Sequence, residues 1–306
     1  MHLAQTKQHV PKIAMIQFWM CVLSSLSVMS CVSDAWSIMA SKKYPFTALN
    51  SRRVDMKEQT WFDGASSPFI AVITEPDACH SYERMNETIQ AIQAAVSSSK
   101  VTLVSVRTSK LDTMVPMEDF EERVVELTRR IVSLSQTFPF LVVVSSDWVL
   151  SAVKAGAHGI HVKESHQERI PDIRRLFSYQ PIIGTSTHAI DSALNAWSLF
   201  QPDYFFAGTC YTTASHPEKN QDKLEGPGLP GKVKVALLER GCTSPVLAIG
   251  GIDEHCCDEP IRLGADGIAT IRAVLQSQDP EQTIKIMYTQ MITDNMCSNH
   301  SLTSML

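Results

Sequence analysis

Two glycine-rich segments in the C-terminal third of the chain carry the clearest chemical signal. One spans residues 248–252 and contains Gly250 and Gly251, and the other spans 264–267. A glycine pair after a buried strand lets main-chain N–H groups approach an anion, and a following helix N-terminus adds its dipole. Arg272 offers a bidentate cation to the same anion. We therefore expect phosphate binding here; the alternatives are ordinary turn glycines and a solvated arginine at a helix start.

Eight short apolar runs are expected to position these residues. Each is apolar nearly throughout, as a strand buried on both faces requires, and each but the last precedes a stretch able to form a crossover helix. We predict a single α/β domain, a (β/α)8 TIM barrel, with a doubly wound open sheet as the alternative. The predicted strands are 69–74, 101–106, 140–144, 159–162, 181–184, 204–207, 246–249 and 267–271.

The clearest helix pattern covers residues 117–136. Phe120, Val124 and Leu127 recur at three- and four-residue steps, with charged residues on the opposite face. In a barrel of this kind the active site lies at the C-terminal ends of the strands, and phosphate commonly sits after strands seven and eight. The glycine-rich segments therefore fall at the expected phosphate site. The other predicted helices are 82–96, 190–199, 232–239 and 281–291.

Composition excludes several classes of protein. The chain has 306 residues, a hydrophobic fraction of 44% and a net charge of −5 without a basic stripe, so we expect no nucleic-acid partner. Its eight cysteines have neither the spacing of a zinc site nor the density of a disulfide scaffold. A reducing compartment fits best. A redox role for the adjacent Cys256 and Cys257 stays open at this stage.

The N-terminal region has the composition of a targeting segment. Lys7 and Lys12 precede an apolar stretch over residues 13–32, which is a secretory signal pattern, and residues 36–54 are basic, serine-rich and free of acidic residues, as in transit peptides. We expect plastid localisation through a signal plus transit peptide, without stable membrane association after processing. Plain secretion and a membrane anchor are the alternatives. The expected divisions are an extension over 1–62, the barrel over 63–293 and a polar, flexible tail over 294–306.

Six spaced motifs together resemble the thiamine phosphate synthase and TenI (thiazole tautomerase) superfamily. The resemblance runs in chain order over residues 101–280, and the segment 156–162 (GAHGIHV) fits the same pattern. It implies a TIM barrel and thiazole phosphate, a small phosphorylated heterocycle, as partner; it leaves a homo-oligomer open. The motifs are GTSTH at 184–188, DYFFAG at 203–208, TAS at 213–215, LEGPGL at 224–229, AIGGI at 248–252 and GADG at 264–267.

The chain departs from the pattern of the synthases in this superfamily. Synthases join a pyrimidine pyrophosphate to thiazole phosphate, which takes magnesium and basic residues to neutralise the leaving group. The places of their metal ligands hold Ser145-Ser146 and residues 163–166, with Asp147 and Glu164 close by. Of the basic positions on the second strand only Arg107 stays in register, and we expect it to be a substrate- or phosphate-binding residue. Pyrimidine pyrophosphate binding is therefore not expected from the resemblance.

The thiazole phosphate half of the pattern is retained. The tautomerase branch uses this half without metal and moves a proton with a histidine after the fifth strand, the position of His188. Imidazole suits this task because its pKa, about 6.5, lets it accept and donate protons near neutral pH. The resemblance implies that the ligand-binding residues are Ser186, Thr213, Ser215, Gly251 and the backbone around Ile271 and Arg272.

We predict a metal-independent, TenI-like thiazole tautomerase, an isomerase without a cofactor, with His188 as its catalytic residue. One alternative is a divergent thiamine phosphate synthase, a transferase whose magnesium is held by Asp147 or Glu164. Another is a non-catalytic module that binds thiazole phosphate or thiamine phosphate. Because the synthases also carry Ser-Thr-His at this position, the alternative role of His188 is to order its loop. We expect His161 to be a packed barrel histidine and Glu225 either to close a loop over the ligand or to cap it.

Overall fold

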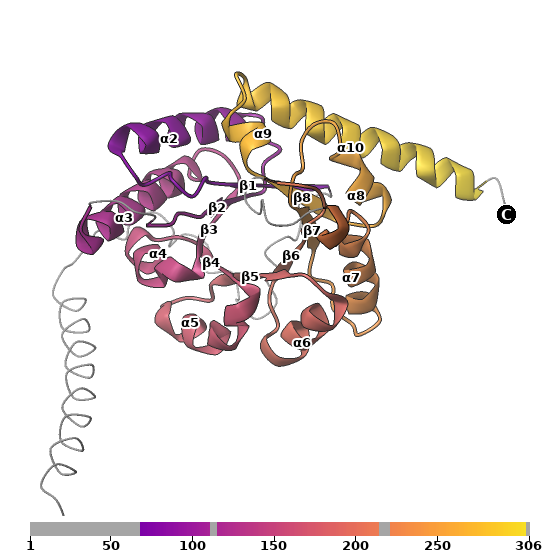
Figure 1. The fold of residues 1–306 in the computed structure, drawn as a ribbon, viewed down its shortest axis with the longest axis horizontal. Coiled ribbons are helices and arrows are strands. Elements are labelled where there is room, and N and C mark those ends of the chain that lie inside the picture. Colours follow the sequence, from indigo (N-terminus) through magenta and orange to yellow (C-terminus); the bar gives the residue numbers. More distant parts are fainter. Residues whose placement is uncertain (1–67, 111–114, 214–220, 304–306) are drawn as a thin grey trace, which may run out of the picture. The chain divides into compact units, whose positions relative to one another are not determined.

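The computed structural model describes residues 68–110, 115–213 and 221–303 of the chain. Within these residues eight parallel strands form a closed barrel in chain order, surrounded by helices (Figure 1). Because β1 pairs with β8, the TIM-barrel prediction is confirmed and the open sheet is excluded. The strands are β1 (Phe69–Ile73), β2 (Leu103–Val106), β3 (Leu141–Ser145), β4 (Gly159–Val162), β5 (Ile182–Thr187), β6 (Tyr204–Gly208), β7 (Val246–Ile249) and β8 (Gly267–Thr270). The predicted targeting extension, 1–62, lies outside the described residues.

The strands are apolar because they are buried on both faces. Inward side chains such as Phe69, Leu103 and Phe206 fill the barrel, while alternate residues pack under the helices. Gly184 of β5 leaves room inside the barrel, since a Cβ atom there would lie 1.9 Å from the ring of Tyr204. Strand β5 runs past its predicted end at residue 184, because its polar C-terminal residues still pair in register with β6.

The outer layer consists of helices that alternate with the strands. In α3 the residues buried against the barrel include Phe120, Val124 and Leu127, as the sequence pattern predicts. The α-helices are α2 (Tyr82–Ser97), α3 (Met117–Leu134), α4 (Val149–Ala155), α5 (Ile170–Leu176), α6 (Ile190–Phe200), α7 (Leu229–Leu238), α8 (Asp258–Arg262), α9 (Arg272–Leu275) and α10 (Pro280–Thr303). The short 3-10 helices are η1 (Ser146–Trp148), η2 (Glu164–Arg169) and η3 (Gln221–Lys223).

Helix α10 continues beyond residue 294, where the sequence predicts a tail. The backbone is helical through Thr303, and the flexibility of this segment stays a prediction. None of the described helices combines the length and apolar character that a membrane span requires.

At the base of the barrel each even-numbered strand is tied to the strand before it by one side chain. The residue immediately before each of these strands makes the hydrogen bond. Burial lowers the pKa of His158, which favours the neutral ring whose Nδ1 accepts such a bond. In the first bond, Oγ1 of Thr102 donates to the carbonyl of Ile70 (3.0 Å). In the other three a main-chain N–H donates: Val142 to Nδ1 of His158 (2.8 Å), Ile183 to Oδ2 of Asp203 (2.6 Å), and Val246 to Oδ2 of Asp266 (2.8 Å).

Candidate active site at the barrel mouth

The C-terminal ends of the strands open at one mouth, where TIM barrels carry their active sites. Two groups of residues lie there, and we name them by the strands at whose C-terminal ends they lie. The β5–β8 side contains Ser186, His188, Gly250, Gly251, Ile271 and Arg272 with Thr213 and Glu225. The β2–β4 side contains Arg107, Ser145, Asp147 and Lys163.

His188 directly follows β5, and its side chain is 42% exposed. Its Nδ1 atom contacts the carbonyl oxygen of Gly208 at the end of β6. Because a carbonyl oxygen only accepts hydrogen bonds, this contact assigns the hydrogen of the neutral ring to Nδ1 and leaves Nε2 as the basic nitrogen. The Oε2 atom of Glu164 lies 3.9 Å from Nε2. A proton taken up at Nε2 therefore forms an imidazolium beside a carboxylate.

Two glutamates hold this histidine in place. Oε1 of Glu164 accepts a 3.1 Å hydrogen bond from the main-chain N–H of His188. Oε1 of Glu225 lies 3.9 Å from Nδ1 of His188, and its Oε2 accepts a 2.6 Å bond from the N–H of Thr209. Glu225 thus fixes the main chain directly after β6, and its expected role of closing or capping a loop at the ligand stays a prediction. The motifs indicate Glu164 only as a substitute metal ligand, because its contact with His188 joins loops that follow different strands.

His161 lies inside the barrel, stacked on Phe206 at 4.4 Å between ring centroids. Its Nδ1 is 3.0 Å from the hydroxyl of Tyr204, and its Nε2 is 2.9 Å from Oγ of Ser186. Burial, with a smaller contribution from the charge of Arg107, lowers the pKa of His161 to about 3. The ring is therefore neutral near pH 7. It is the packed barrel histidine that the sequence predicts, and it also positions the hydroxyl of Ser186.

The two glycines after β7 have left-handed backbone conformations, with φ of 105° at Gly250 and 66° at Gly251. A Cβ atom on Gly251 would lie 2.4 Å from the carbonyl oxygen of Thr212, so both the conformation and the close approach of the two segments require glycine. Arg272 begins α9 beside them, and its guanidinium donates a 3.2 Å bond to Oγ1 of Thr213. Gly251 and Arg272 thus approach two adjacent residues, Thr212 and Thr213, on the β5–β8 side.

The charges on the β2–β4 side are paired with one another. Nζ of Lys163 lies 2.7 Å from Oδ2 of Asp147, and the hydroxyl of Ser145 donates to the same oxygen at 3.3 Å. Burial lowers the pKa of the nearby Arg107, and the Asp147 carboxylate opposes that shift. Asp147 therefore already balances positive charge supplied by the chain itself.

A buried carboxylate connects β1 to the helix that carries Arg272. Glu75 is 7% exposed, forms an ion pair with Arg84 of α2, and accepts a 2.6 Å bond from the side-chain amide of Gln276. Gln276 is the C-terminal cap of α9. The contact holds α9 against the barrel. No local sequence pattern indicates it, because Glu75 and Gln276 are 201 positions apart.

Comparison with known proteins identifies the family to which this barrel belongs. The model of the thiamine monophosphate synthase (TMP-TENI) family matches residues 70–274, from β1 into α9. The chain belongs to the thiamine monophosphate synthase family. It is therefore a member of a family of thiamine-biosynthesis enzymes, as the motif resemblance implies.

Curated relatives of this family member carry the name thiamine-phosphate synthase. The protein from Clostridium acetobutylicum is 28% identical over 199 residues, 65% of this chain and 85% of the relative. The protein from Listeria monocytogenes is 33% identical over 147 residues, 48% of this chain and 64% of the relative. Among solved structures, thiamine phosphate pyrophosphorylase from Pyrococcus furiosus has a TM-score of 0.57 at 21% identity, covering 74% of this chain and 96% of that one, which supports the fold.

The synthases of this family are expected to use magnesium, and the donors in this chain fit that ion poorly. Magnesium prefers an octahedral set of oxygen ligands, usually including carboxylates. Here Asp147 is paired with Lys163, and both oxygens of Glu164 face His188. Within the described parts of the chain, no three His, Cys, Asp or Glu side chains form a group that could hold a metal. We therefore derive no step through a metal ion.

The adjacent cysteines lie in the segment between β7 and α8. Sγ of Cys256 is 3.3 Å from Oδ1 of Asp253, and the buried Cys257 is 3.3 Å from Oε1 of Gln290. Burial raises the pKa of both thiols to about 12. Both are therefore protonated and weakly nucleophilic near neutral pH, although Cys256 is only half-buried, which argues against a reactive pair.

The structure brings most of the predicted site residues of this family member to the mouth. Those after β5, β7 and β8 gather on one side, whereas Arg107 lies on the other. Ile271 caps the N-terminal end of α9 and packs with the residues inside the barrel. Ser215 lies outside the described residues.

Proposed function

We propose that this chain binds thiazole phosphate on the β5–β8 side of the mouth and moves a proton within the bound ring, as a metal-independent thiazole tautomerase. The observation that carries this proposal is the contact of His188 Nδ1 with the Gly208 carbonyl, which leaves Nε2 as a base beside Glu164. Imidazole is suited to both halves of a proton transfer near pH 7.

The phosphate group would bind where Gly251 and Arg272 meet. A guanidinium and glycine main chain are typical partners of a phosphate monoester. Arg272 is already oriented by Thr213, and α9 is held by the bond between Glu75 and Gln276. This arrangement would fix the substrate at the phosphate end and leave the ring near β5.

The ring would meet His188, with the Ser186 hydroxyl as an additional polar contact. Tautomerisation removes a proton from one ring position and returns one to another, so it balances without a second substrate. Nε2 of His188 takes the proton, Glu164 stabilises the imidazolium, and the same nitrogen returns the proton. A positioned acid–base group of this kind typically contributes about 10²–10⁴-fold to the rate.

A thiamine-phosphate synthase is the second candidate, and the names of the curated relatives favour it over the tautomerase. In that reaction Arg107 and Lys163 would neutralise a pyrophosphate. The ion pair between Lys163 and Asp147 weighs against this function, because it would have to open before either side chain met a ligand.

Two assays on the purified chain separate these functions. We expect turnover of thiazole carboxylate phosphate in excess EDTA. Pyrophosphate release from pyrimidine pyrophosphate and thiazole phosphate that depends on magnesium, without activity in the first assay, would overturn the tautomerase and establish the synthase. Ligand-induced thermal stabilisation without turnover in either assay would leave a binding module instead.

A further inference from the structure

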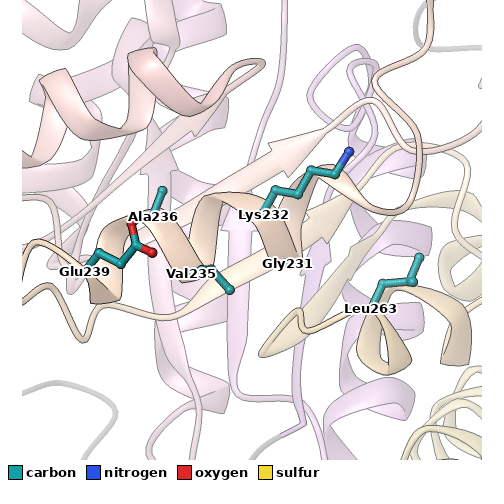
Figure 2. Close-up of a pocket in the computed structure, with 6 residues that line it drawn as sticks. All are labelled: Gly231, Lys232, Val235, Ala236, Glu239 and Leu263. Carbon is teal, nitrogen blue, oxygen red and sulfur yellow. The ribbon is translucent and has the colours of Figure 1, made fainter.

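Helix α7 presents an exposed stripe on the outside of the barrel. Lys232, Val235, Ala236 and Glu239 recur at steps of three, four and seven residues, the spacing of one helix face. With Gly231 and Leu263 they line a groove of about 340 Å³, and Figure 2 shows Leu263 beyond the Gly231 end of the helix. The opposite face of α7 is the one that packs on the barrel, through Val233 and Leu237.

The stripe is apolar in its centre and charged at its ends. Val235 is 57% exposed, and Leu263, across the groove, is 47% exposed. Lys232 and Glu239 flank this centre with opposite charges, about 10 Å apart along the helix axis. An apolar centre with a charged rim is typical of a protein–protein contact surface.

We propose that this face binds a second copy of the chain, with the two α7 helices packed antiparallel about a two-fold axis. An axis that passes between Val235 and Ala236 sets Val235 against the partner's Ala236, a large side chain against a small one. The same axis brings Lys232 opposite the partner's Glu239 at one end of the contact and Glu239 opposite the partner's Lys232 at the other. The surface is therefore complementary to itself, as a two-fold interface requires.

Charge also selects the orientation of the two helices. A parallel arrangement would place Lys232 against the partner's Lys232 and Glu239 against the partner's Glu239, which is repulsive at both ends. Ion pairs at the rim of an interface mainly fix register and exclude wrong arrangements, whereas the apolar centre supplies most of the affinity. The small side chain of Ala236, at the centre of the contact, allows the helix axes to approach within about 8–10 Å.

A charge-swap series on the full chain tests this interface. Sedimentation velocity over a range of concentrations should show a dimer for the unaltered protein. Lys232→Glu sets two pairs of glutamates face to face, and Glu239→Lys does the same with lysines, so each should weaken dimerisation by about tenfold or more. The double variant Lys232→Glu/Glu239→Lys restores both ion pairs and should return to within about threefold of the original Kd. Lys154→Glu, an exposed charge reversal on α4, is the matched control and should change nothing.

The double variant separates a lost contact from a lost fold, since it carries both substitutions. A chain that is monomeric throughout the concentration range would overturn the proposal. So would a dimer insensitive to either single reversal, or a double variant that stays dissociated although its thermal melt matches that of the unaltered protein. None of these outcomes depends on the enzymatic activity of the barrel mouth.

Discussion

The two sides of the barrel mouth use their charged residues in opposite ways. On the β5–β8 side, two carboxylates surround one imidazole, and a guanidinium stands beside a glycine turn. On the β2–β4 side, a lysine and an aspartate neutralise each other. Charged residues that form an ion pair with each other must separate before either can bind a ligand. The arrangement of the charges, and not their number, therefore distinguishes the two sides.

The two sides also differ in how they are held. On the β5–β8 side, Glu225 binds the main chain of Thr209, and Gly251 packs directly against the main chain of Thr212. On the β2–β4 side, the Lys163–Asp147 pair joins two partly exposed side chains. Contacts to main chain restrict geometry more than contacts between long side chains do. Substitutions on the β5–β8 side are therefore expected to have the larger effects.

The largest expected effect is that of His188→Asn. Removing the proton carrier should lower kcat for the tautomerase reaction by about 10²–10⁴-fold, while thermal stabilisation by thiazole phosphate persists because the phosphate contacts remain. Steady-state kinetics and a thermal-shift assay measure the two quantities. His255→Asn is the control, since that side chain is 83% exposed. If kcat of His188→Asn is undiminished, His188 is not the acid–base residue of the reaction.

Gly251→Ala should follow, with Gly241→Ala as its matched control. Both glycines have positive φ, 66° and 78°, so alanine costs each roughly 1–2 kcal/mol of conformational energy. Only at Gly251 does the added Cβ also meet backbone, whereas at Gly241 it meets nothing within 4 Å. We expect KM for the phosphorylated substrate to rise about tenfold or more in Gly251→Ala and to stay unchanged in Gly241→Ala. Equal KM values in the two variants would place the phosphate elsewhere.

A smaller effect is expected on the pH dependence of stability. The pKa of His161 is about 3 in the folded chain, below the value of about 6.5 in an unfolded one. Between these limits the unfolded state binds the extra proton, so this residue makes stability fall as the pH drops from about 6.5 towards 3. Urea unfolding at several pH values in this window should show a shallower loss in His161→Gln. Parallel curves for the two proteins would show that His161 titrates alike in both states.

The smallest expected effect is that of Asp147→Asn. An ion pair between partly exposed side chains contributes about 0–1 kcal/mol, so stability should change little. Tautomerase turnover should stay within about twofold, because Asp147 lies on the other side of the mouth from His188. The same variant is also assayed for magnesium-dependent pyrophosphate release, the activity of a synthase. If the unaltered protein has that activity and Asp147→Asn loses it, the β2–β4 side belongs to a synthase site.

The sequence predicts the barrel well because burial on both faces leaves a local signature in each strand. All eight strands were found from their apolar runs, and the mouth followed from the order of the elements. The predicted end of β5 is too early, because Thr185, Ser186 and Thr187 are polar although they pair with β6. Polar residues at the end of a strand are predicted as a loop when the neighbouring strand with which they pair is not known.

Contacts across the barrel were the part that the sequence could not supply. Glu164 and His188 are 24 positions apart and follow neighbouring strands, so their contact depends on the closed barrel. The bond between His161 and Ser186 depends in addition on which residues face inward. No periodic pattern encodes such pairs, and chemical reasoning from motifs assigned Glu164 to a different partner.

The side-chain bonds at the base of the barrel divide it into four units, each an odd-numbered strand with its even-numbered successor. Each unit is held together by one of these bonds between consecutive strands. Other side-chain bonds join neighbouring units: Oγ1 of Thr185 in β5 donates to the carbonyl of Val162 in β4 (3.1 Å), and Oγ of Ser244 donates to the carbonyl of Pro202 (3.0 Å). A circular permutant opened at the seam between β4 and β5 would keep all four ties within continuous chain.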